Sequence, residues 1–168
     1  LYSSETDAYN RIVDQSHSSG NEGFLAMTDQ GYLVLPDYKN DATTVDPKEY
    51  GYKFVNGNIV DPFGKTYNTF GTVHTHLDDS GPSTYTLNGY GDLGFGSYQT
   101  PNMPIYVLQM GNNVVSFLVA YPNPSGQRTN FKYNKFFFND KANIRSLLKG
   151  KFSLKEYTMQ NQYQFNNF

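Results

Sequence analysis

The chain has 168 residues, a length that suits one domain with a hydrophobic core of its own. It contains no cysteine, which excludes disulfides and thiolate metal sites. Its formal net charge is -2 with scattered basic residues, and its apolar runs have the length of strands, so neither a nucleic-acid partner nor a membrane-spanning helix is expected.

The chain is predicted to begin with a helix followed by a β-hairpin. Residues 4–17 are mostly polar and carry apolar side chains at helical spacing, and Gly20 follows as a stop signal. The apolar runs 23–27 and 32–35 flank the turn sequence 29–31, a pattern that is typical of a hairpin.

The rest of the chain is predicted to continue the same domain, because no linker or internal repeat interrupts residues 1–168. After the hairpin, a long polar surface excursion over 37–69 is predicted to contain at most a small hairpin. It is followed by a strand at 69–76, a Gly-rich loop to 91, a short helix at 92–98, strands at 104–110 and 114–121, and a helix at 140–149. The aromatic C-terminal extension at about 151–168 is expected to fold back onto the domain.

Two of the three histidines in the chain, His74 and His76, stand at the end of the predicted strand 69–76. Residues i and i+2 of a strand point to the same face, so both imidazoles are expected to project side by side. A carboxylate follows at Asp92, and two imidazoles plus one carboxylate, with a position left for water, form the composition of a catalytic zinc site. A hydrogen-bonded pair of histidines without a metal fits the same spacing.

Three short motifs, Gly71-Thr72-Val73-His74-Thr75-His76, Pro82-Ser83 and Gly91-Asp92-Leu93, follow the predicted helix and hairpin in a characteristic order. Over roughly residues 7–121, this order resembles the JAB/MPN (JAMM) metallopeptidases. Within that family it is most similar to the JAB-like domains at the C-terminal ends of bacterial polymorphic toxins. The resemblance implies an α/β fold of the JAB/MPN (cytidine-deaminase-like) type, with a mixed central sheet flanked by helices.

The resemblance also implies a site. It predicts that His74, His76 and Asp92 bind Zn²⁺, that Glu22 is the general base, and that Ser83 helps to hold the oxyanion. The chain departs from the family pattern here, because Thr84 and Leu87 occupy the positions where the family has its serine and aspartate. Ser83 stands one residue earlier and Asp92 farther along, so residues 84–90 are expected to be an insertion.

Other residues leave alternatives open. Asp78 or Asp79 is an alternative third ligand, although both follow the His-x-His strand closely. Glu22 directly precedes the Gly-Phe step, nearer than is usual in the family, and a solvent-exposed carboxylate before the strand is the alternative to a base. His17 is expected at the end of the first helix, where a cation meets the helix dipole favourably, and it is assigned no catalytic role.

The function that this pattern implies is zinc-dependent hydrolysis of a peptide or isopeptide amide bond in a protein or peptide substrate. The chain starts without an initiator methionine and shows no signal segment, so it is expected to be the C-terminal toxin part of a larger exported bacterial protein that a small cognate immunity protein inhibits. The alternative is a noncatalytic binding or scaffolding module that keeps the JAB/MPN fold.

Overall fold

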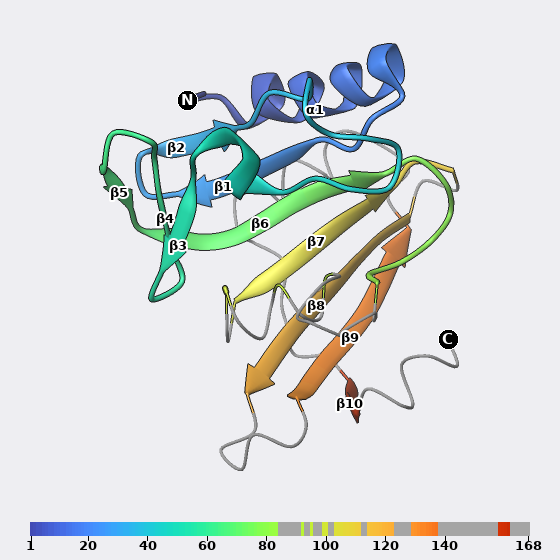
Figure 1. Ribbon diagram of the computed structural model, residues 1–168. Helices are drawn as coiled ribbons and strands as arrows, with labels where there is room; N and C mark the ends of the chain where they lie inside the picture. Colours follow the sequence, from blue (N-terminus) through green and yellow to red (C-terminus); the bar gives the residue numbers. More distant parts are fainter. Residues whose placement is uncertain are drawn as a thin grey trace.

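A computed structural model describes residues 1–83, 92, 95, 99–100, 103–111, 114–122, 129–137 and 158–161 (Figure 1). The first element is helix α1 (Glu5–Ser19), whose N-terminus is capped by the Ser4 side chain, which accepts a hydrogen bond from the Asp7 N–H at 3.3 Å. The helix ends at Gly20 in the left-handed conformation with φ 71°. The predicted first helix is therefore confirmed.

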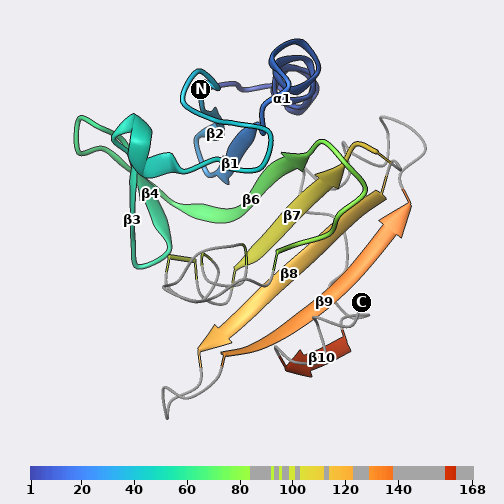
Figure 2. The same ribbon diagram turned by 45° about the vertical axis from the view of Figure 1, so that its right-hand side comes forward.

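The centre of the molecule is a seven-stranded sheet with the order β10-β9-β8-β7-β6-β1-β2. The strands are β1 (Phe24–Thr28), β2 (Gly31–Val34), β6 (Thr69–His76), β7 (Pro104–Gln109), β8 (Val114–Pro122), β9 (Thr129–Phe137) and β10 (Thr158–Asn161). Strands β6 and β7 are parallel and the other neighbours are antiparallel, so the sheet is mixed. Figure 2 shows its strong twist from β2 to β9. The α/β class and the mixed sheet agree with the sequence prediction.

The polar excursion between β2 and β6 is more ordered than the sequence predicts. It contains the 3₁₀ helix η1 (Pro47–Tyr50) and a second sheet of β3 (Lys53–Val55), β4 (Asn58–Val60) and β5 (Thr66–Tyr67). The predicted small hairpin is β3–β4, and its turn residues Asn56 and Gly57 both have positive φ, at 52° and 82°. The extra strand β5 is held because Ile59 and Tyr67, which pair across β4 and β5, are buried in the core.

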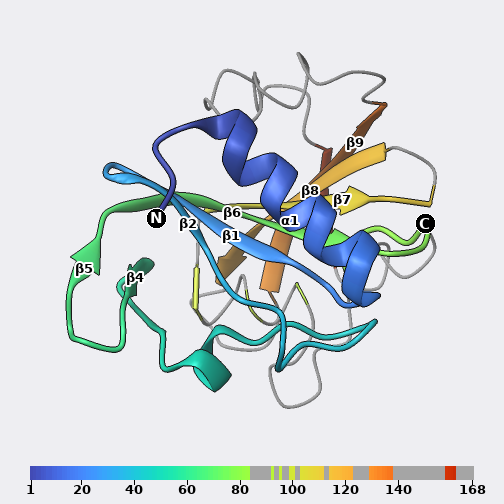
Figure 3. The ribbon, with the colours of Figure 1, turned by 90° about the horizontal axis from the view of Figure 1, so that it is seen from above.

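The large sheet is covered on both faces at β1, whose residues are all buried. Leu25 and Met27 belong to the core cluster that also contains Ala8 and Ile12 of α1, and Figure 3 shows α1 lying over this side of the sheet. The alternate β1 residues Phe24 and Ala26 belong to a second cluster with side chains of the excursion, among them Leu35, Ile59 and Tyr67. The sheet therefore has a helix face and an excursion face.

The C-terminal predictions are covered only in part. Strand β10 places residues 158–161 of the aromatic extension beside β9, in antiparallel register. Asp92 and Phe95 of the predicted short helix are helical. The predicted helix at 140–149 lies outside the described residues. Within the described parts of the chain, no helix has the length and apolarity needed to cross a membrane.

Candidate metal centre

His74 and His76 form the nucleus of the site at the C-terminal end of β6. Phe24 on β1 is the cross-strand partner of His74, so both histidines project from the excursion face of the sheet, and the intervening Thr75 points to the helix face. Both histidines are buried, and their Nε2 atoms lie 3.2 Å apart. The strand period predicted this arrangement from the sequence.

Glu22, immediately before β1, brings a carboxylate to the histidines. Its Oε1 lies 3.7 Å from His76 Nε2, and only 5% of the residue is exposed, so the alternative of a solvent-exposed carboxylate is wrong. One ligand atom from each of Glu22, His74 and His76 lies within 4.8 Å of the other two, and this buried group could hold a metal ion.

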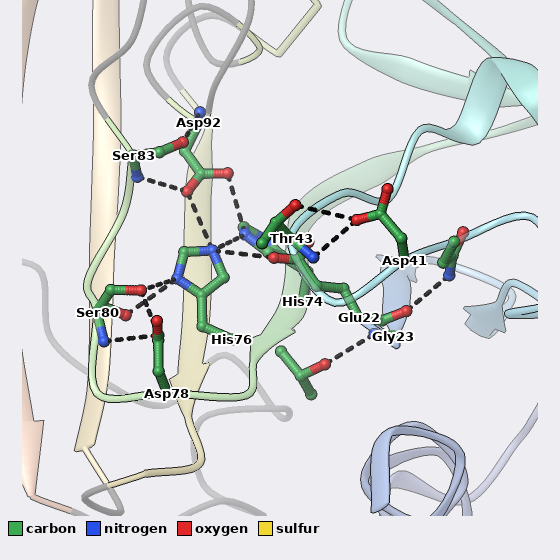
Figure 4. Close-up of polar contacts among 12 residues, drawn as sticks. Glu22, Gly23, Asp41, Thr43, His74, His76, Asp78, Ser80, Ser83 and Asp92 are labelled. Carbon is green, nitrogen blue, oxygen red and sulfur yellow. Dashed lines mark hydrogen bonds and ion pairs between the residues drawn. The ribbon is translucent and has the colours of Figure 1, made fainter. Parts of the chain in front are cut away.

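Asp92 brings a second carboxylate to the same point (Figure 4). Its Oδ1 lies 3.0 Å from His74 Nε2, and its Oδ2 lies 3.6 Å from His76 Nε2. Ser83 holds it there by a reciprocal pair of hydrogen bonds. The Ser83 N–H donates to Asp92 Oδ2 at 2.7 Å, and the Asp92 N–H donates to Ser83 Oγ at 2.8 Å. These bonds resemble a helix capping box, in which two side chains satisfy each other's backbone donors.

Of the two alternative aspartates, Asp78 has its carboxylate engaged elsewhere. The Asp78 carboxylate accepts hydrogen bonds from the backbone N–H and hydroxyl of Ser80, and the Asp79 carbonyl accepts one from the Gln109 side chain. Among the described residues, Asp92 is the aspartate that makes ion-pair contacts with both histidines. His17 is exposed in the last turn of α1, as expected.

Tetrahedral coordination gives a test of fit. With zinc–nitrogen and zinc–oxygen distances of about 2.0 to 2.2 Å, the donor atoms of a tetrahedral site lie about 3.3 to 3.5 Å apart. The two Nε2 atoms lie 3.2 Å apart, Asp92 Oδ1 lies 3.0 Å from His74 Nε2, and the other oxygen, Oδ2, lies 3.6 Å from His76 Nε2. Glu22 is slightly farther, at 3.7 Å from His76. The donors therefore have the chemistry and spacing of a metal site, with three close ligands and one carboxylate beside them.

Burial and neighbouring charges shift the titration of these groups in different directions. Burial raises the pKa of Glu22 to about 7, against the lowering effect of His74. Burial alone lowers the pKa of His74, but the adjacent Asp92 carboxylate outweighs this effect and raises it to about 8. Burial and the charge of His74 lower the pKa of His76. Burial favours the neutral form of Asp92, yet the two histidines and the Ser83 N–H outweigh it and lower its pKa.

Ser80 fixes the orientation of His76. His76 Nδ1 lies 3.0 Å from the Ser80 carbonyl oxygen, which can only accept a hydrogen bond. Nδ1 therefore carries the proton in this contact, and Nε2 presents its lone pair to the centre. A histidine ligand is commonly oriented in this way by a bond at its other nitrogen.

Thr75 and Ser16 support Glu22 from the helix face. The Gly23 N–H donates to Thr75 Oγ1 at 2.7 Å, and the Thr75 N–H donates to the Gly23 carbonyl at 3.0 Å. Thr75 Oγ1 is also 2.7 Å from Ser16 Oγ of α1. Both the N–H and the carbonyl of Gly23, the residue after Glu22, are thus bonded to the strand that carries the histidines.

The excursion supports Glu22 from the other side. The Glu22 N–H donates to the Asp41 carbonyl at 2.8 Å, and the Asn40 side-chain amide donates to the Glu22 carbonyl at 2.7 Å. Asn40 in turn accepts a hydrogen bond from the Tyr50 hydroxyl. The roles of Asn40, Ser80, Thr75 and Ser16 are not predictable from the sequence, because they depend on contacts between separate segments. The one local signal was the glycine after Glu22.

The centre opens onto a cleft of about 1280 Å³. Glu22, the two histidines, Ser83 and Asp92 line one end of it, and residues 42–49 and 52–54 of the excursion line the rest together with Phe24, Leu77 and Phe95, among others. The centre is therefore buried but accessible from this cleft.

No family model, no curated protein and no solved structure matches this chain.

Proposed function

We propose that this chain is a zinc-dependent hydrolase of the JAB/MPN (JAMM) type that cleaves a peptide or isopeptide amide bond. The observation that carries the proposal is the convergence of His74, His76, Asp92 and Glu22 on one buried point at the end of an open cleft. Two imidazoles and a carboxylate as ligands, with a second carboxylate beside them, supply the groups that amide hydrolysis requires.

The residues divide the chemistry between them. Zinc held by His74, His76 and Asp92 would act as a Lewis acid and activate a water molecule at neutral pH. Glu22 would accept a proton from that water and return it to the leaving amine nitrogen. A pKa of about 7 suits a group that must both take and give a proton near neutrality. Ser83 Oγ accepts from the Asp92 N–H, so its own hydroxyl proton remains a donor for the developing oxyanion.

The delivery route is part of the same proposal and depends on the resemblance to toxin-terminal JAB-like domains. We propose that the domain acts in a recipient bacterium and that a cognate small protein inhibits it in the producing cell. Expression of the domain in a sensitive bacterium, with and without the neighbouring gene product, tests this point. Growth that is unaffected by the hydrolytically active domain would remove the toxin role.

Zinc content tests the centre. We expect one zinc per chain in the protein purified without chelator, and strong loss in His74→Ala and His76→Ala, because each removes a ligand. His17→Ala is the matched control, since His17 is exposed on α1, and it should keep the zinc. Full zinc content in both of the first two variants would place the metal elsewhere.

Glu22→Gln separates the enzyme from the noncatalytic binding module. The side chain is nearly isosteric and is not assigned as a ligand, so zinc and fold should remain while hydrolysis of peptide and isopeptide substrates falls by about 10²- to 10⁴-fold. Equal activity in parent and variant would clear Glu22 of the role of base. A zinc-loaded parent that cleaves no peptide or isopeptide in a broad panel would favour the binding module.

A further inference from the structure

An aromatic wall adjoins the metal centre. Phe24 on β1, Phe54 on β3 and Phe95 after the Gly-rich loop meet edge to face, with ring centroids 6.4 Å apart for Phe24 and Phe95 and 5.2 Å apart for Phe54 and Phe95. All three line the cleft that contains the centre. Phe54 and Phe95 are only partly buried, so part of their apolar surface faces the cleft rather than the core.

Two of these phenylalanines are tied to proposed ligands by the backbone. Phe24 is the cross-strand partner of His74, and side chains of such pairs lie on the same face with Cβ atoms about 4.5 to 5.5 Å apart. Phe95 follows Asp92 by three residues, and both are helical, so they share one side of that helix. A substrate group at the metal is therefore immediately beside the wall.

Charged side chains of the excursion also line the cleft. The charged residues of the excursion that line it are Asp46, Lys48, Glu49 and Lys53, in which acidic and basic groups balance. Next to the centre, Phe24, Phe54 and Phe95 offer apolar contact to a neighbouring substrate side chain.

We propose that the aromatic wall of Phe24, Phe54 and Phe95 receives an aromatic or large aliphatic side chain of the substrate, on a residue that adjoins the scissile amide. This inference rests on the proposed hydrolase function and specifies its substrate class. Phe54 lies on β3 in the excursion and contacts the Phe95 ring edge to face, so a substitution at Phe54 changes the wall without replacing a residue of the strand or helix that carries the ligands.

Binding of small hydroxamates to the zinc-loaded protein tests the wall without requiring turnover. N-acetyl-phenylalanine hydroxamate probes the carbonyl side of the bond, and a benzylsuccinyl hydroxamate probes the amine side. Each is compared by calorimetry with its counterpart lacking the benzyl group. We expect at least one benzyl compound to bind about tenfold or more tightly than its counterpart.

Variants assign this preference to the wall. Phe54→Ala should reduce the ratio of the two dissociation constants, without and with the benzyl group, to near one. Phe54→Trp should shift the preference towards smaller side chains. Phe63→Ala is the matched control, because Phe63 is 96% exposed and does not line the cleft. A ratio of affinities is insensitive to a fraction of unfolded protein, so modest destabilisation does not obscure the result.

The outcomes distinguish this inference from the function on which it rests. The proposed role of the wall would be refuted by equal affinity with and without the benzyl group on both sides of the bond. It would also be refuted by a preference that Phe54→Ala and Phe54→Trp leave unchanged. Neither result would contradict the hydrolase function. A protein that takes up no zinc would overturn both.

Discussion

Thr75 shows how a single residue can matter at the site without facing it. It lies between the two histidines in sequence, but it is fully buried on the helix face, where it joins Gly23 to Ser16. Its hydroxyl therefore fixes the position of Glu22 relative to the histidines. In this interpretation Thr75 is a positioning residue.

Thr75→Val tests that role. Loss of the hydroxyl leaves the Gly23 N–H and the Ser16 hydroxyl without this partner, which should lower the free energy of unfolding by about 1 to 3 kcal/mol. Hydrolysis should fall through kcat with zinc retained, and Thr75→Ser should restore both quantities. Thr66→Val at an exposed position is the control. Positioning would be refuted if Thr75→Val kept full kcat while stability fell.

The pKa shifts of the centre predict how the metal-free protein responds to pH. A group whose pKa is higher in the folded state contributes stability at low pH, and that contribution is lost as the pH rises through the folded pKa. For Glu22 the loss runs from pH 4.5 to about 7 and amounts to at most about 3 kcal/mol. For His74 it runs from pH 6.5 to about 8.

We therefore expect the chelated protein to lose stability as the pH rises through this range, as measured by urea unfolding. The lowered pKa of His76 opposes the trend below pH 6.5, so the contribution of Glu22 is read from the difference between parent and Glu22→Gln. Zinc-loaded protein should show the reverse slope, because metal binding releases protons from its ligands. Parallel curves for parent and Glu22→Gln would contradict the raised pKa of Glu22.

The residues of the centre were predictable where local pattern decides their placement. The strand period alone predicted that His74 and His76 share one face, and the His-x-His and Gly-Asp-Leu motifs together predicted Asp92 as the third ligand. The burial of Glu22 was not predictable, because it results from the excursion, whose Asn40 and Asp41 bond to its backbone from far along the chain. Sequence spacing alone cannot reveal such long-range contacts.

At the scale of elements, the junction of α1 with β1 depends on Gly23. A Cβ at this position would lie 3.1 Å from the Ile12 carbonyl oxygen and 3.2 Å from Ile12 Cβ. Both atoms belong to a packed helix, so they cannot move away without shifting α1. Glycine here allows the helix to approach the strand that follows Glu22.

Gly23→Ala should therefore destabilise the protein by about 1 to 3 kcal/mol, the usual cost of overpacking. Gly71→Ala is an informative comparison, because there the closest atom is the end of the flexible Met27 side chain, which can rotate away. Chemical denaturation of both variants measures the difference. A Gly23→Ala variant as stable as the parent would show that α1 can shift freely.

Elements with strong periodicity were predicted nearly to the residue, as β6 illustrates. Two strands were missed for different reasons. β5 has two residues, too few for any pattern, and it exists because Tyr67 is buried. β9 was overlooked although residues 130–134 alternate polar and aromatic, a short period-two signal that favours a strand.

At the scale of the whole molecule, the centre joins three segments that are far apart along the chain. Glu22 comes from the start of β1, the histidines from the end of β6, and Asp92 from beyond the Gly-rich loop. A metal held by the two histidines and Asp92 would cross-link the end of β6 to the segment that carries Asp92, and these ligands are not preassembled in the unfolded chain. Metal binding should therefore stabilise the folded molecule as a whole.

Chelation measures this coupling. Zinc present at about a thousand times its dissociation constant stabilises the folded state by about 4 kcal/mol, which for a chain of this length corresponds to a rise in Tm of roughly 10 °C. We expect EDTA to remove that increment from the parent and from His17→Ala. His74→Ala should melt at one temperature with or without zinc. If the parent melted at the same temperature in zinc and in EDTA, these side chains would not bind the ion in the folded state, and the buried histidines would be a hydrogen-bonded pair.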